Sequence, residues 1–330
     1  MATNTLAPPR PATGVERDSI TERIWQGTDL LVHGRFQEAH TALEQDGRGT
    51  SARHTVELAR AMQLQVMQEA ETPGPDGHAP IEDWNTSKVT ANRMALLLLG
   101  LPSAAEAQDR IDNHSSHDKP TDVALLSGFN QEIAGVLAHM PPAMMDEFPD
   151  RLLRRSNNLL KGKWGLPIMD ERNIAITMAG ARREAAVLRA LHQTLPEDWS
   201  VRQTSTEEDL RGSDLVVYNP DGWELRMDIK SRNGFDHAVD DMLRQGIISR
   251  EQADRAREKG VVYRRSKDQT GEKVYNCIFD ADQMGRINNY EYDDPFNVFE
   301  FVERQFEEQS QSRLRKLGKH AIIVQSQTTY

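Results

Sequence analysis

Two aspartates and a lysine in the segment 212–232 (GSDLVVYNPDGWELRMDIKSR) have the residue types and spacing of a metal-binding site. Asp214 opens one apolar run, and Asp228 and Lys230 lie at the end of the next. Because side chains alternate between the two faces of a strand, Asp228 and Lys230 share a face. Magnesium prefers oxygen ligands and is usually held by one or two carboxylates together with phosphate oxygens. The segment therefore predicts that Asp214 and Asp228 hold a magnesium ion.

Lys230 and the backbone of Ile229 extend this site. Next to a metal ion, Lys230 is expected to orient a water molecule or to stabilise charge that develops on a phosphate, where preorganised cationic donors contribute most to catalysis. The carbonyl of Ile229 offers one more oxygen ligand. Magnesium is the expected cofactor, with manganese as its substitute.

These residues resemble the PD-(D/E)XK nuclease superfamily. Asp214 matches the first acidic position of the motif, and Asp228-Ile229-Lys230 match its second half, whereas Ser213 replaces the nominal proline. The resemblance covers roughly residues 170–330. It implies a restriction-endonuclease-like α/β core, with a mixed sheet flanked by helices, and magnesium-dependent hydrolysis of phosphodiester bonds.

A helix expected from about Ile174 to Leu195 carries a further candidate, Glu184. The helical stripe of this segment consists of Ile174, Met178, Ala181, Ala185 and Leu188, and Glu184 lies among them. A carboxylate on a buried stripe is costly unless it is paired or bound to metal. The resemblance implies that Glu184 is a third metal ligand; the alternative is a glutamate at the edge of the stripe, paired with Arg183 or another arginine.

Charge is distributed unevenly along the chain. The net charge is −11, yet residues 1–150 carry 11 basic and 22 acidic side chains, whereas residues 151–330 carry 29 of each. The acidic excess is thus confined to the first half, and DNA is the expected partner of the second half. The alternative is that the basic residues lie on solvated helix faces. The predicted nucleic-acid contacts are Arg182, Arg183, Arg189, Arg232, Arg264, Arg265 and Lys267.

The first half of the chain reads as helical. Residues 1–18 are rich in Pro, Thr and Ala and predict a disordered arm, followed by an all-α domain over 19–160. Helices are expected from Ser19 to Leu43 and over Ser51–Ala70, Ser87–Gly100, Val123–Met140 and Met144–Leu160. The acidic balance favours contact with a protein partner, or homodimerisation, over DNA binding; a plain scaffold is an equal alternative.

The second half, residues 161–330, is expected to be mixed. After the helix that bears Glu184, strands are predicted at WSVRQTS, SDLVVYN and WELRMDIKS, the last two joined by a turn at 219–222. Helices follow over His237–Gln245 and Arg250–Lys259, the latter opened by a capping box of Ser249 and Gln252. Further strands are expected at VVYRR, EKVYNCIFD and HAIIVQS, with a helix over 295–316 whose apolar face carries Phe296, Phe299, Val302 and Phe306. The fold class is α+β.

Other residue groups predict less. His114, His117 and Asp118 have a metal-like spacing, but their NHSSHDKP context favours a solvated loop. The acidic residues Glu207, Glu208 and Asp209 are alternatives to Asp214.

Several classes of protein are disfavoured. The single cysteine, Cys277, excludes an internal disulfide and a cysteine-cluster zinc site. The sequence contains neither a phosphate-binding glycine loop nor a serine hydrolase elbow. It has no apolar run of membrane-spanning length and no signal peptide, so a soluble, cytoplasmic protein without a membrane partner is expected.

Taken together, these features predict a magnesium-dependent DNA endonuclease. Its helical N-terminal domain is expected to serve targeting, assembly or protein contact. The alternative is a non-catalytic nucleic-acid-binding or adaptor protein that retains the nuclease fold.

Overall fold

The computed structural model describes residues 18–33, 35–45, 87–139, 161–162, 165, 168–204, 208–209, 212–267, 273–288 and 290–308. The chain divides into two compact units, the first comprising residues 1–185 and 203–214 and the second residues 186–202 and 215–330. Four predicted segments lie outside the described residues: the arm up to residue 17, the helices over Ser51–Ala70 and Met144–Leu160, and the strand at 320–326.

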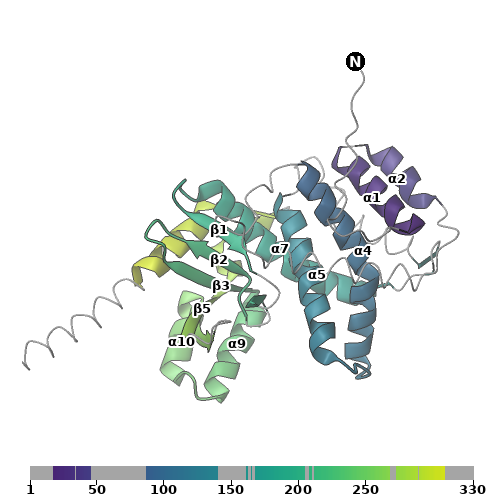
Figure 1. Ribbon diagram of the computed structural model, residues 1–330. Coiled ribbons are helices and arrows are strands. Elements are labelled where there is room, and N and C mark those ends of the chain that lie inside the picture. Colours follow the sequence, from purple (N-terminus) through teal and green to yellow (C-terminus); the bar gives the residue numbers. More distant parts are fainter. Residues whose placement is uncertain are drawn as a thin grey trace, which may run out of the picture. The chain divides into compact units, whose positions relative to one another are not determined.

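The first unit is helical in its described parts (Figure 1). It contains α1 (Ser19–Val32), α2 (Phe36–Glu44), α4 (Ser87–Asp112), α5 (Lys119–His139) and the first part of α7 (Glu171–Thr194). Helix α1 packs against both α2 and α4, and α4 packs against α5. Asp18 caps α1 by accepting a hydrogen bond from the backbone N–H of Thr21 at 2.7 Å. The buried stripe predicted for α7 is confirmed along its whole length.

Helix α4 is longer than the sequence predicted. The expected end at Gly100 is wrong, because the helix continues through Pro102 to Asp112. A proline inside a helix costs about 3 kcal/mol, since it removes one hydrogen bond and clashes with the preceding turn. Buried residues on both sides of Pro102, including Leu99, Leu101 and Ala104, outweigh this cost by packing.

An ion pair joins the end of α4 to the start of α5, which begins before its predicted residue. Arg110 binds the buried carboxylate of Asp122 through Nε at 3.0 Å from Oδ2 and Nη2 at 2.6 Å from Oδ1. Ser116 donates a hydrogen bond to the same carboxylate at 2.6 Å. The hydrogen bond to Asp122 raises the pKa of Arg110. The turn between the two helices is therefore fixed by a satisfied buried charge.

The second unit is built on a mixed five-stranded sheet with the order β1-β2-β3-β5-β4. The strands are β1 (Ser200–Gln203), β2 (Leu215–Tyr218), β3 (Glu224–Lys230), β4 (Val261–Lys267) and β5 (Lys273–Asp280). Strand β3 pairs antiparallel with β2 and parallel with β5, and β4 pairs antiparallel with β5. The predicted α+β class and mixed sheet are confirmed. The sequence did not predict the small pair β6 (Ile287–Asn288) and β7 (Glu291–Tyr292) or the 3-10 helix η3 (Ala281–Met284).

The predicted hairpin between β2 and β3 is confirmed. Tyr218 pairs with Glu224, and the backbone N–H of Asn219 donates to the carbonyl of Trp223 at 3.1 Å. The side chain of Asn219 accepts from the N–H of Trp223 at 2.8 Å. Gly222 has φ 74°, a left-handed conformation that glycine adopts without strain. The turn chemistry thus fixes the register of the hairpin.

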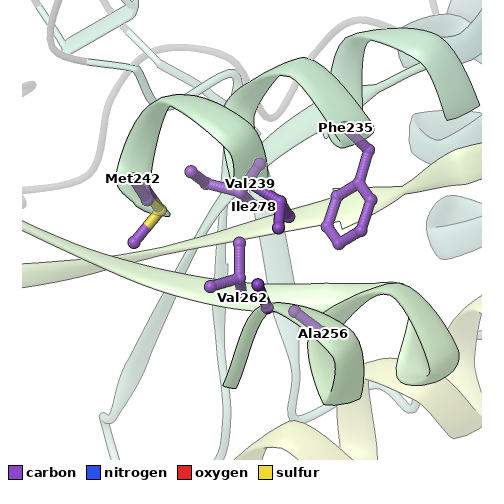
Figure 2. Close-up of a cluster of buried hydrophobic side chains, with 7 residues drawn as sticks. Phe235, Val239, Met242, Ala256, Val262 and Ile278 are labelled. Atoms are coloured by element: carbon purple, nitrogen blue, oxygen red, sulfur yellow. The ribbon is translucent and has the colours of Figure 1, made fainter. Parts of the chain in front are cut away.

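Helices α9 (Arg232–Arg244) and α10 (Arg250–Lys259) cover one face of this sheet. Figure 2 shows Phe235, Val239 and Met242 of α9 converging with side chains of α10, β4 and β5. On the other face, the ring of Phe279 stacks on Phe301 at a centroid distance of 5.0 Å. Phe301 belongs to the helical residues 296–308, so helical residues lie against both faces.

The starts of α9 and α10 and the apolar face of the last helix were each predicted from the sequence. The capping box of α10 is confirmed, with Gln252 N donating to Ser249 at 3.2 Å. The predicted start of α9 at His237 is wrong, because the helix begins five residues earlier, at Arg232, where the side chain of Ser231 caps it by accepting a hydrogen bond from Gly234 N at 3.1 Å. Within the predicted helix 295–316, Phe296 is exposed rather than part of the buried face. No helix among the described residues is long and apolar enough to cross a membrane.

We predict opposite effects for two glycine-to-alanine substitutions in helices of the first unit. In Gly27→Ala, the new Cβ would lie 2.5 Å from Cγ of the buried Leu43, so we expect the free energy of unfolding to fall by about 1–3 kcal/mol. In the matched control Gly180→Ala, the new Cβ meets nothing within 4 Å, and we expect a gain of about 0.5–1 kcal/mol. Urea unfolding followed by circular dichroism measures both. Stabilisation of both variants would contradict the α1–α2 packing.

Candidate metal and nucleic-acid site

Asp228 is the buried acidic residue around which the candidate site of the second unit is built. It lies in β3 with 2% of its surface exposed. Lys230 forms an ion pair with its Oδ1, and Nη2 of Arg264 lies 3.5 Å from its Oδ2. The apolar alternates of the strand, Leu225 and Met227, are fully buried. The predicted alternation of β3, with Asp228 and Lys230 together, is therefore confirmed.

The two cations around Asp228 explain how its charge is tolerated. An ionised carboxylate is costly to bury unless a counter-charge and hydrogen bonds compensate it. The side chains of Lys230 and Arg264 are each 37% exposed, whereas that of Asp228 is 3% exposed. Each cation therefore keeps contact with solvent while it neutralises the buried carboxylate.

Asp214 is the last residue of the first unit; it directly precedes β2 in the sequence and is partly buried. Its backbone carbonyl accepts a hydrogen bond from Thr204 N at 3.1 Å. The register pairs Leu215 with Met227, so Asp214 immediately precedes one member of this pair and Asp228 immediately follows the other.

Two of the three acidic residues proposed as alternatives to Asp214 take part in hydrogen bonds within the first unit. The carboxylate of Asp209 accepts a hydrogen bond from Ser127. Glu208 is buried, and its carbonyl accepts from Ser213 N at 3.2 Å. Glu207 lies outside the described residues. Asp214 remains the stronger candidate, because it alone of these residues directly precedes strand β2.

Glu184 is bound by a residue that the sequence analysis missed, Gln203. Nε2 of Gln203 lies 3.0 Å from Oε1 of Glu184 and also donates to the carbonyl of Gln131 at 3.2 Å. Arg183, the predicted alternative partner, instead donates to the carbonyl of Ala179 at 2.8 Å. All of these residues belong to the first unit. Gln203 is buried and lies two residues after Val201 in β1, so both side chains are on the same face of the strand. A polar residue at such a position was the sequence signal that it needs a hydrogen-bond partner.

Asn276 is a second buried polar residue that the sequence analysis passed over. It lies in β5, where the register places it opposite both Arg226 and Arg264. It is 1% exposed. An asparagine within an otherwise apolar strand (VYNCIF) was the signal for this position.

The donor set fits a hard divalent cation in type. Asp214 and Asp228 offer carboxylate oxygens, and Ile229, in β3 opposite Phe279 of β5, offers a carbonyl. Against this, no group of three or more His, Cys, Asp or Glu residues suited to a metal ion occurs in the described part of the chain.

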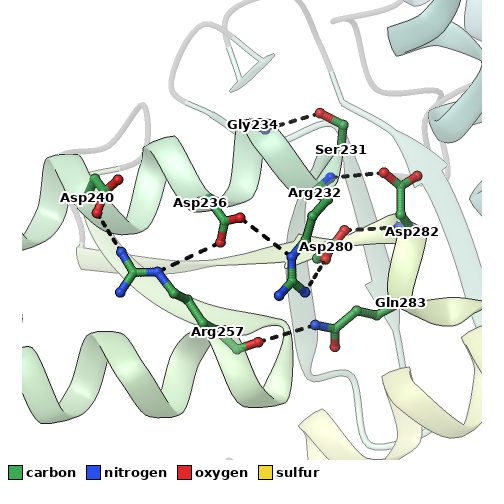
Figure 3. Close-up of polar contacts among 9 residues, drawn as sticks. All are labelled: Ser231, Arg232, Gly234, Asp236, Asp240, Arg257, Asp280, Asp282 and Gln283. Atoms are coloured by element: carbon green, nitrogen blue, oxygen red, sulfur yellow. Dashed lines mark hydrogen bonds and ion pairs between the residues drawn. The ribbon is translucent and has the colours of Figure 1, made fainter.

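Arg232 is part of a polar network at the end of β5 (Figure 3). Its Nη1 donates to Oδ2 of the fully buried Asp280 at 3.0 Å, and its Nε lies 3.5 Å from Asp236. Its backbone N–H donates to Asp282 at 3.0 Å. The hydrogen bond to Asp280 raises the pKa of Arg232. Arg257 of α10 joins the network through an ion pair with Asp236 of α9. Arg232, which the sequence predicts to contact nucleic acid, therefore also holds this part of the structure together.

The remaining predicted basic contacts differ in exposure. Arg189, a predicted nucleic-acid contact, is buried, and its Nε donates a hydrogen bond to Glu291 at 3.1 Å. Its guanidinium therefore has a protein partner and little access to a phosphate. Arg182 and Arg265 are exposed. Lys267 lies in β4 and pairs with Lys273 of β5.

The histidines of the NHSSHDKP segment lie in an exposed turn, as predicted. His114 and His117 are both exposed. The side chain of Asp118 accepts a hydrogen bond from Thr121 N at 3.3 Å and thereby caps α5. This segment therefore ends one helix and starts the next.

Comparison of the chain with protein-family models, with curated proteins and with solved structures finds no match.

We predict that Asp280→Ala lowers the free energy of unfolding by about 1–3 kcal/mol, because it removes the buried acceptor shared by Arg232 and the backbone N–H of Asp282. The matched control is Asp241→Ala, at an exposed residue paired with Arg244, and we expect it to stay within about 0.5 kcal/mol of the parent. Urea unfolding measures both. Equal losses would show that the network of Figure 3 contributes no specific stability.

Proposed function

We propose that this chain is a magnesium-dependent endonuclease that hydrolyses phosphodiester bonds in DNA, on a restriction-endonuclease-like core. One observation carries the proposal: Asp228 is buried in a central strand with Lys230 against its carboxylate. Asp214 directly precedes Leu215, whose backbone pairs with Met227, the residue before Asp228. A mixed sheet with helices against it is the architecture that the resemblance to PD-(D/E)XK nucleases implies.

In this proposal Asp214 and Asp228 hold the ion through carboxylate oxygens, with the carbonyl of Ile229 as a further ligand. When bound, magnesium polarises the phosphate and lowers the pKa of a coordinated water. Manganese, which takes similar oxygen ligands, substitutes for it. Glu184 is not required as a ligand, because Gln203 already binds its carboxylate.

Lys230 has two tasks in the proposed site. Its ammonium lies against Asp228 and so holds positive charge at the carboxylate edge before substrate binds. Its partial exposure allows the same group to donate a hydrogen bond to a phosphate oxygen of DNA. A fixed cation stabilises charge that develops on the phosphate at little reorganisation cost.

The first half of the chain, by contrast, is acidic. Residues 1–150 hold its 22 acidic side chains against 11 basic ones. We assign this half to targeting or assembly through a protein partner or a second copy of the chain, because an acidic surface repels phosphate and suits a basic partner.

We predict that Asp214→Asn, Asp228→Asn and Lys230→Met each lower DNA cleavage by at least about 100-fold, the usual effect of removing a preorganised electrostatic group. The assay uses supercoiled plasmid and branched DNA with magnesium or with a chelator. Matched controls are Asp241→Asn and Lys259→Met, at exposed residues on the helices α9 and α10, and these should cleave like the parent. Thermal unfolding by circular dichroism identifies any variant that fails to fold. Undiminished cleavage by folded Lys230→Met would refute the mechanism.

A second candidate is a non-catalytic nucleic-acid-binding or adaptor protein, in which Asp228 forms a purely structural ion pair. The specific observation in its favour is that both Lys230 and Arg264 already neutralise Asp228. No metal is then needed to compensate the buried charge.

Calorimetric titration with magnesium or manganese separates the two candidates. The nuclease predicts binding heat that disappears in Asp214→Asn. It also predicts several-fold tighter metal binding by Lys230→Met, because that change removes a cation that competes for Asp228. Absence of metal heat in the parent protein would favour the structural ion pair.

A further inference from the structure

Arg264 reaches the carboxylate of Asp228 from a strand that does not adjoin β3. It lies in β4, at the edge of the sheet, and β5 separates that strand from β3. The register places Arg264 opposite Asn276 of β5, yet its Nη2 lies 3.5 Å from Oδ2 of Asp228. Lys230 forms an ion pair with the other oxygen, Oδ1. Each oxygen of the candidate metal ligand Asp228 therefore has a cation against it.

Arg264 adds a positive charge to a strand face whose own charges already cancel. On the face of Asp228, β3 carries two carboxylates, Glu224 and Asp228, and two cations, Arg226 and Lys230. Arg226 lies with its Nε 2.9 Å from Oε1 of Glu224, and Lys230 lies against Asp228. Within β3 each carboxylate thus has one cation, and Arg264 is a second counter-ion for Asp228.

A divalent ion at Asp228 would leave this second counter-ion in surplus. Adding Arg264 and the proposed ligand Asp214 to the charges of β3 gives three cations and three carboxylates, which sum to zero. A magnesium ion would raise that sum by two positive charges, and like charges at short range repel. An anion relieves the repulsion. In the proposed nuclease that anion is a phosphodiester group, to which a guanidinium donates two parallel hydrogen bonds.

We propose that Arg264 is a positioning residue that couples the metal ion to the substrate. It neutralises Asp228 in the resting site, and it turns to a substrate phosphate when the metal ion takes that carboxylate. Its side chain is 37% exposed, so it changes partner without being buried further. The inference rests on the proposed nuclease function and adds that magnesium and DNA each strengthen the binding of the other, because such coupling is reciprocal.

Magnesium binding by the full-length protein without DNA tests the first half of this exchange. In calorimetric titrations, Arg264→Gln should have a dissociation constant about 2- to 5-fold lower than that of the parent, the range for losing a partly exposed counter-ion. Arg264→Lys keeps the cation and should stay near the parent. The matched control Arg265→Gln changes the next residue of β4, which is exposed and on the opposite face, and should leave the constant unchanged. The rise of the thermal midpoint with magnesium, followed by circular dichroism, gives a second reading and identifies any variant that fails to fold, in which case Arg264→Met takes its place.

Cleavage of supercoiled plasmid tests the second half. In the parent, the magnesium concentration that gives half-maximal cleavage should fall as the plasmid concentration rises, a measurement that needs no variant. In Arg264→Gln that magnesium concentration should be lower and independent of plasmid, while KM for plasmid rises by about 10-fold or more, the usual effect of losing a hydrogen bond to a charged group.

The outcomes separate this inference from the nuclease itself. If the parent binds magnesium and folded Arg264→Gln binds it equally or less tightly, the exchange of Arg264 is overturned and the nuclease stands. An unchanged KM for plasmid in Arg264→Gln overturns the contact with phosphate. Magnesium binding by Arg264→Gln alone would keep Arg264 as the competitor for Asp228 and refute a magnesium-dependent parent. Absence of magnesium binding by the parent and by every variant would refute both.

Discussion

The arrangement of the second unit depends on the side-chain alternation of β3. This strand is paired on both sides, antiparallel with β2 and parallel with β5. A shift of its register by one residue would place Leu225 and Met227, now fully buried, on the face of Asp228 and Lys230. The apolar face therefore fixes where the carboxylate lies. Because Asp228 must then be buried, the neighbouring chain has to supply compensating charge, and Lys230 and Arg264 do so.

Local signals predicted the parts of the fold that local chemistry decides. The turn at 219–222 and the capping box of α10 follow from side chains within a few residues, and both were predicted from the sequence. The early start of α9 was missed because Gly234 is a poor helix former, although the side chain of Ser231 caps the helix by accepting a hydrogen bond from the backbone N–H of Gly234. The passage of α4 through Pro102 was missed for the opposite reason, because tertiary packing outweighs an unfavourable local residue.

The candidate site shows the same division between local and distant interactions. Strand periodicity alone brought Asp228 and Lys230 together. The partners of Glu184 and Arg189, however, lie 19 and 102 residues away in the chain, at Gln203 and Glu291. Periodicity places a residue on a face but does not select its partner from another element. Buried polar residues in apolar strands, such as Asn276, were the part of this information that the sequence did contain.

The pairing of Asp228 with two cations bears on both candidate functions, because it is a stable arrangement that a metal ion would have to displace. At an effective dielectric constant of about 20, two unit charges about 4 Å apart interact by about 4 kcal/mol, and a divalent ion at the same place interacts about twice as strongly. In the proposed nuclease this exchange would free Lys230, whose side chain already reaches solvent, for the phosphate of a substrate. The proposed nuclease would therefore need two states, one in which Lys230 neutralises Asp228 and one in which a metal ion takes the place of the lysine. A structural ion pair needs only the first state, which makes the second carboxylate, Asp214, the residue whose metal-binding role distinguishes a nuclease from a nucleic-acid-binding scaffold.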